Sequence, residues 1–195
     1  MEVYIGNPTN GDKALVTPEG RLRTYSVSET IVENAAEDGN SYNVNTGTIN
    51  LTSANESGVL YLKNNGINDL HIASIGFLLG NSTGGTGDLE VKVYKNSTAG
   101  TLISGATDVD ILENKNGGSS NTLTVDCYKG AEGSTITDGA SWYTSLLAGS
   151  ARPYVISTGT IVIPKGGSVA VSITPQASNT SMNVQVFLSL IEYTL

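Results

Sequence analysis

Alternation between apolar and polar residues is the feature that most constrains this chain. Near the C-terminus, Met182, Val184, Val186, Leu188 and Leu190 share one face of an alternating run. A period of two places successive side chains on opposite faces of a β-strand. Short runs of this kind recur from about residue 40 onward, with turn signals between them. The pattern predicts an all-β protein built as an antiparallel β-sandwich.

Turn residues divide the alternating region into about ten strands, a usual number for two packed sheets. Residues 64–66 have the Asn-Gly chemistry of a hairpin turn, residues 80–87 form a Gly-rich loop, and residues 164–167 make a tight connection. The predicted strands are 43–52, 58–63, 69–79, 89–94, 101–103, 109–112, 122–128, 154–163, 168–174 and 182–193.

The first residues differ from the rest of the chain. Residues 1–36 contain few paired alternations and carry a turn at Thr17, Pro18, Glu19 and Gly20. We predict an extended N-terminal arm over 1–36 and one β-sandwich domain over 37–195. Such an arm can add a strand to a neighbouring sheet edge, although a frayed terminus is the alternative.

Charge and hydropathy exclude several classes of partner. Acidic residues outnumber basic ones 18 to 10, which gives a net charge of −8, and such a field repels nucleic acid and anionic membranes. The start has neither a basic nor an apolar segment of a secretory signal, so we expect a chain kept in the cytosol. No apolar run approaches the length of a transmembrane helix, so we expect no membrane partner.

Nucleophilic chemistry has few candidate residues. Cys127 is the single cysteine and shares a strand face with Leu123 and Val125, so it is expected to be a small buried hydrophobe. His71 is the single histidine and lies within a predicted strand. Asp69 lies on the same face and could orient it, but no Gly-x-Ser-x-Gly elbow accompanies the pair.

Carboxylates and glycine-rich segments also fall short of a signature. The Gly-rich loop 80–87 lacks the lysine of a phosphate-binding motif, and Asp108-x-Asp110 lacks the spacing of a calcium loop. We therefore assign no catalytic, cofactor-binding or metal-binding residue, and we expect a non-enzymatic protein without a cofactor. The carboxylates considered for glycoside hydrolysis are Glu90, Asp108, Asp110, Glu113, Asp126 and Glu132.

Aromatic and large apolar residues suggest surfaces for contact with other chains. Trp142 is the single tryptophan and is expected in the core. Phe187 and Ile191 lie on the polar face of the last strand, where a loop or another subunit would cover them. Tyr143 and Tyr154 are expected to be exposed residues of a receptor- or carbohydrate-binding surface, if the chain has one.

Five stretches of the chain bear on its family: residues 16–22, 55–65, 117–123, 128–133 and 175–184. Through these stretches the chain resembles small structural proteins of tailed-bacteriophage virions. The similarity is diffuse, extends through most of the chain and includes no catalytic signature.

The resemblance implies a jelly-roll or related β-sandwich that assembles as a homotrimer or dimer, with a trimer favoured, and that decorates a capsid or forms fibres. Its expected partners are the major capsid protein or other virion proteins, and its expected location is the virion, assembled in the host cytoplasm. The leading hypothesis is a capsid decoration or head-fibre protein whose arm docks on the shell. The alternative is a tail-fibre or receptor- or carbohydrate-binding tip.

Overall fold

The computed structural model describes residues 15–16, 22–23, 30–80, 88–99, 108–148, 153–176 and 181–193. The chain divides into two units, Met1–Thr30 and Ile31–Leu195. In the first unit, β1 (Leu15–Val16) pairs antiparallel with β2 (Leu22–Arg23). The turn predicted at residues 17–20 lies outside the described residues. The assignment of residues 1–36 to an extended arm stays a prediction.

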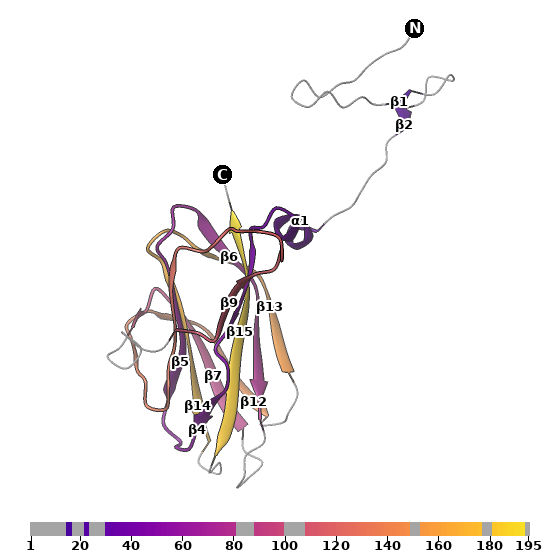
Figure 1. Cartoon of the computed structure of the whole chain (residues 1–195). Coiled ribbons are helices and arrows are strands. Elements are labelled where there is room, and N and C mark those ends of the chain that lie inside the picture. The colour runs from indigo at the N-terminus through magenta and orange to yellow at the C-terminus, as the bar shows by residue number, and fades with distance from the viewer. Residues whose placement is uncertain are drawn as a thin grey trace. The chain divides into compact units, whose positions relative to one another are not determined.

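The second unit is a sandwich of two antiparallel sheets (Figure 1). The first sheet consists of β13 (Pro153–Ile163), β6 (Asp69–Leu79), β15 (Met182–Tyr193), β3 (Ser41–Asn45) and β9 (Ile111–Asn114), with β4 (Ile49–Leu51) paired to the start of β15. The second sheet consists of β10 (Val125–Lys129), β5 (Ser57–Asn64), β14 (Ser168–Pro175), β7 (Asp88–Lys95) and β12 (Ala140–Ala148). A separate small sheet pairs β8 (Thr98–Ala99) with β11 (Ile136–Thr137).

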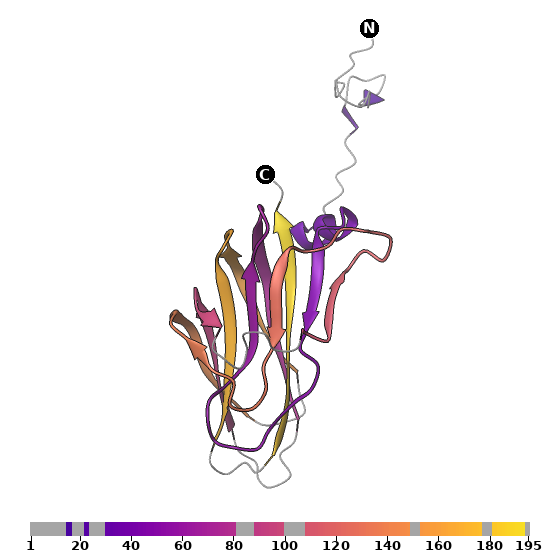
Figure 2. The same cartoon turned by 60° about the vertical axis from the view of Figure 1, so that its left-hand side comes forward.

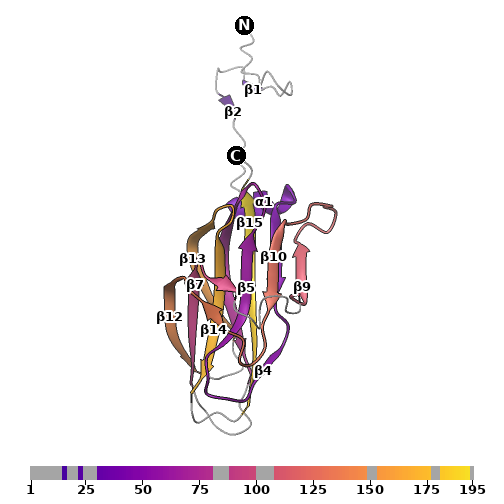
Figure 3. The same ribbon diagram turned by 90° about the vertical axis from the view of Figure 1, so that its left-hand side faces the viewer.

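The order in which the chain crosses between the sheets is that of a jelly roll. Strands β3, β15, β6 and β13 form one four-stranded layer, and strands β5, β14, β7 and β12 form the other. Strands β9 and β10 are inserted between β7 and β12 and add one strand to each sheet. They lie at one edge of the sandwich, whereas β12 and β13 lie at the opposite edge (Figure 3). The predicted antiparallel sandwich is confirmed.

The core lies between the inner faces of the two sheets. The alternating residues predicted to face inward from β15, Met182 through Leu190, are all fully buried. Phe77 from β6 and Leu60 from β5 are fully buried in the same cluster. Cys127 is 6% exposed and belongs to this cluster, which confirms its expected role as a small hydrophobe. Alternation therefore sets which face of each strand is buried.

Three local expectations differ from the structure. The strand predicted over 43–52 is divided into β3 and β4, because Gly47 adopts a positive φ of 67° between them. The turn at residues 64–66 is not a hairpin, since it joins β5 of one sheet to β6 of the other. Strand β12 was not predicted, because its residues lack a clean alternation. The strand predicted at 101–103 lies outside the described residues.

A short helix, α1 (Ile31–Glu37), was also not predicted. It packs against β3 and β15 at one end of the sandwich (Figure 1). The segment between β9 and β10 runs beside it (Figure 2). Its Asn116 Nδ2 donates to the carbonyl oxygen of Glu37 at 2.9 Å, and Asn114 Nδ2 donates to that of Gly39 at 2.6 Å. These bonds satisfy carbonyls at the C-terminal end of the helix.

Candidate functional site

Four of the six carboxylates considered for sugar hydrolysis lie around one depression beside β9 and β10. This depression has a volume of about 410 Å³ and is open to solvent. Asp110 forms an ion pair with Lys129, and Cys127 contributes to the lining. Burial, assisted by the charge of Asp108, raises the pKa of the Cys127 thiol to about 12. The thiol is therefore protonated at neutral pH and is a poor nucleophile. The four carboxylates are Asp108, Asp110, Glu113 and Asp126.

The fifth carboxylate, Glu132, holds a neighbouring loop. One of its oxygens accepts hydrogen bonds from the backbone N–H groups of Thr52, at 2.7 Å, and Ser53. The other accepts from the Thr52 hydroxyl at 2.6 Å. Hydrogen bonds from Thr52 and Ser53 hold the pKa of Glu132 below its ordinary value. These hydrogen bonds connect the loop that contains Glu132 to the loop that contains Thr52 and Ser53.

The sixth carboxylate, Glu90, belongs to a charged network on the outer face of the second sheet. Lys92 Nζ lies 3.1 Å from Glu90 and 3.4 Å from Glu56. Glu56 also accepts hydrogen bonds from Tyr94, at 2.8 Å, and from the buried Ser172. Burial raises the pKa of Glu56, but the hydrogen bonds from these hydroxyls, together with Lys92, outweigh burial and hold it below the ordinary value. The network crosses β7 and β14 and ties Glu56 to the sheet.

His71 is placed by strand pairing and by a neighbouring ring. It lies opposite Val162 on one side and Ile191 on the other. Its ring centroid is 4.5 Å from that of Tyr193. Asp69 pairs with Tyr193 in the same ladder. His71 therefore packs as an aromatic member of the outer face of the first sheet.

Metal-binding clusters and membrane-spanning helices are both absent from the described part of the chain. No group of three or more His, Cys, Asp or Glu side chains is arranged there to hold a metal ion. No helix in the same residues combines the length and apolar character needed to cross a bilayer.

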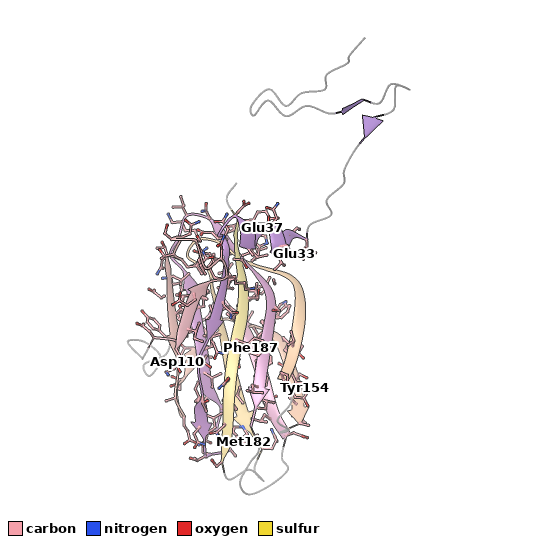
Figure 4. All side chains as sticks on the ribbon, turned by 45° about the vertical axis from the view of Figure 1, so that its right-hand side comes forward. Glu33, Glu37, Asp110, Tyr154, Met182 and Phe187 are labelled. Carbon is pink, nitrogen blue, oxygen red and sulfur yellow. The ribbon has the colours of Figure 1, made fainter. Side chains whose placement is uncertain are left out.

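The end of the sandwich that carries α1 presents exposed apolar residues, and we call it the α1 end. Ile67, in the turn between β5 and β6, is 83% exposed, and Ile31 is 63% exposed. Ile31 and Tyr193 line an open depression of about 370 Å³ with Ala35. The turn lies beside them, because Asn68 Nδ2 donates to Glu192 of β15 at 3.1 Å. Figure 4 shows Glu33 and Glu37 of α1 at this end and Met182 at the opposite end.

Strands β12 and β13 form one edge of the sandwich, which we call the β12 edge, and they carry exposed apolar residues on its two outer faces. Leu146 of β12 and Val155 of β13 are each 59% exposed, and Val162 of β13 is 45% exposed. Trp142 is 40% exposed, so its expected place in the core is wrong. It is the extra residue of a β-bulge, since Ser141 and Tyr143 pair with the consecutive residues Tyr94 and Val93. Tyr143 takes the inward position in its place, which leaves the tryptophan at the surface.

Other predicted surface residues are more covered than expected. Ile191 is 5% exposed and lines the depression beneath α1, so a helix of this chain covers it. Phe187 is half-buried, and its ring lies over Gly76 of the adjacent strand. Tyr143 and Tyr154 are half-buried and pack against the core, so the expectation of two exposed tyrosines is wrong.

Sequence reasoning missed the most exposed apolar residues of the α1 end and of the β12 edge. Ile67 follows Asn65 and Gly66, and a large apolar residue directly after a turn signal was a sign of an exposed side chain. Leu146 lay in a segment without alternation, so nothing local marked it as an edge-strand residue. Ile31 belongs to a helix of seven residues, which is too short to show a helical period.

Comparison with protein-family models found no match, and comparison with curated proteins found none either. Among solved structures, the chain shows weak similarity to a viral capsid protein, VP2 of infectious bursal disease virus. The VP2 subviral particle has 12% identity and a TM-score of 0.18, with coverage of 78% of this chain and 41% of that chain. A structure of the Gx strain of the same virus has 13% identity and a TM-score of 0.18, with coverage of 92% of this chain and 47% of that chain. The chain thus spans less than half of each matched chain, and the proposal below rests on its own geometry.

Proposed function

We propose that this chain is a non-enzymatic structural protein of a tailed-phage virion, and that it binds the shell as a decoration or head-fibre protein. The observation that carries the proposal is the α1 end. Exposed Ile67 of the β5–β6 turn and exposed Ile31 and Val32 of α1 gather there. The predicted arm over 1–36 runs into this helix. An arm and an apolar surface that belong to one chain can engage the same partner together.

The acidic residues at the α1 end indicate the chemistry of the partner surface. Glu33 and Glu37 of α1 and the adjacent Asp38 surround the apolar residues with acidic groups. The whole chain carries a net charge of −8. A complementary partner surface has an apolar patch with a basic rim. We propose that the major capsid protein, or another virion protein, provides it after assembly in the host cytoplasm.

Shell binding tests the proposal directly. Purified shells are mixed with the full chain, sedimented, and assayed for bound protein. Ile67→Asp places a charge at the most exposed apolar residue, so we expect weaker binding by roughly tenfold or more. Ile111→Asp is the matched control, because Ile111 is 42% exposed on β9, outside the α1 end. Equal binding by the wild-type chain and Ile67→Asp would remove the α1 end from the interface.

Deletion of residues 1–30 tests the arm separately. If the arm docks on the shell, the shortened chain binds more weakly than the full chain while its circular dichroism spectrum keeps the strand signal. Unchanged binding would show that the arm has no docking role. Binding to host cells or glycans, with no binding to shells, would instead support a receptor- or carbohydrate-binding tip.

A further inference from the structure

The edges of the two large sheets differ in how they are protected against pairing with another strand. An edge strand exposes unpaired backbone groups, and proteins usually block it with charges, proline, short length or irregular pairing. Strand β13 starts at Pro153 and has an irregular register between Ser157 and Ile161. Strand β9 has only 4 residues, and β10 carries Asp126 and Lys129.

Strand β12 lacks most of these protections. Its nine residues, ASWYTSLLA, include no charged residue, no proline and no glycine. Its one irregularity lies at the start, between Ser141 and Tyr143, and leaves 143–148 in regular register with β7. Within the described residues β7 is the only strand paired with it. An uncharged edge of this length is a template with which another strand can pair.

We propose that β12 pairs with β12 of a second copy of this chain, antiparallel across a two-fold axis at Thr144. The proposal deepens the structural role given above and rests on it. The pairing joins the five-stranded sheet of one copy to the five-stranded sheet of the other, and the two then form one continuous sheet. A strand edge that meets its own copy forms an isologous contact, which closes as a dimer. The edge geometry thus favours the dimer, one of the two oligomers that the resemblance implies, over the trimer.

The order of residues along β12 makes this pairing self-complementary. With the axis at Thr144, residues 143–145 of the two copies pair in regular register, and Leu146 of each copy lies beside the bulge that carries Trp142 of the other. Aromatic–aliphatic pairs and Thr–Thr pairs are favourable across strands. Trp142 and Leu146 are 40% and 59% exposed in the single chain, so both gain burial. No charge is brought opposite a like charge.

The size of the contact indicates its strength. Nine residues at about 3.3 Å each make an edge roughly 30 Å long. The two sheets are packed about 10 Å apart, and with their side chains the sandwich edge is about 15 Å thick. The contact is then roughly 450 Å² per copy, smaller than the approximately 800 Å² of a standard interface. We therefore expect a dimer that forms with increasing concentration and dissociates on dilution.

The test uses the full chain and two readouts. Sedimentation velocity over a dilution series measures the mass, and the fluorescence of Trp142, the single tryptophan, reports on the edge itself. We expect a monomer–dimer equilibrium in which the emission shifts to shorter wavelength as the dimer forms. Thr144→Lys puts two like charges opposite each other and should weaken the dimer by roughly tenfold or more. Ile111→Lys, at the opposite edge, should dimerise as the wild type does.

A mixture of variants tests the register. Thr144→Lys and Thr144→Glu should each be monomeric, and their equimolar mixture should recover the dimer, because opposite charges then face each other. Circular dichroism shows that both variants are folded. A wild-type monomer at every concentration, a trimer, or no recovery in the mixture overturns the two-fold pairing. If shells bind the Thr144→Lys variant while the wild type is monomeric, the edge inference fails and the proposed function stands.

Discussion

Gly76 lies beneath an aromatic ring, and adding one methyl group there tests the packing of the outer face. A Cβ atom at Gly76 would lie 1.9 Å from Cζ and 2.0 Å from Cε2 of Phe187, which pairs with Gly76 across β6 and β15. The three nearest atoms all belong to this ring. Phe187 therefore compensates for a glycine within a strand by covering it.

The size of the effect follows from two opposing contributions. Displacing a ring from its place costs about 1–3 kcal/mol. A middle value of about 2 kcal/mol applies, because the whole ring must move but the half-buried Phe187 can swing toward solvent. Alanine in place of strand glycine stabilises by about 0.5–1 kcal/mol when nothing obstructs it. We expect Gly76→Ala to lower the free energy of unfolding by about 1 kcal/mol, or Tm by about 2–4 °C. In a Phe187→Ala background the same change should raise the free energy of unfolding by about 0.5 kcal/mol.

A double-mutant cycle measured by urea unfolding checks this reasoning. Circular dichroism follows the loss of the sheets for the wild type, both single variants and the double variant. Gly117→Ala is the control, since a Cβ there meets nothing within 4 Å. If Gly76→Ala destabilises the chain equally with and without the ring, the Phe187 ring does not lie over Gly76 and the argument is refuted.

Three further predictions concern single groups. Cys127, with its thiol pKa raised to about 12, should react with thiol reagents at pH 8 only after unfolding; rapid labelling of the folded chain would contradict its burial. The lowered pKa of Glu56 means that its stabilising contribution is complete above the ordinary glutamate pKa of about 4.3 and is lost as pH falls through the lower folded pKa. Acid unfolding should therefore depend less steeply on pH in Glu56→Gln, and an unchanged slope would refute this. Glu132→Ala should speed amide hydrogen exchange at Thr52 and Ser53, because the Glu132 carboxylate accepts hydrogen bonds from their N–H groups. Unchanged exchange would show that these hydrogen bonds do not hold the loop.

Strand identity was largely predictable because it depends on local chemistry. The strands predicted at 69–79 and 182–193 have the bounds of β6 and β15. Cys127 was placed in the core from its neighbours alone, since alternation assigns each residue to a face. The same reasoning failed for β12 and α1, where the period is absent or too short to detect.

The candidate surfaces were harder to predict because exposure depends on neighbours distant in sequence. Ile191 looked like a subunit contact, yet α1 covers it. Trp142 was expected in the core, yet a bulge against β7 turns it outward. A bulge is a property of two strands and has no signature in one of them.

The amino-acid sequence by itself determined that this protein is a β-sandwich, because a period of two needs only the residues of one strand. Only the tertiary structure decided that the strands cross as a jelly roll, that β12 is an uncharged edge, and that apolar residues gather at the α1 end. The physical reason is that hydrogen-bond partners and sheet edges arise from pairing between segments far apart in the chain, and many pairings satisfy the same local pattern.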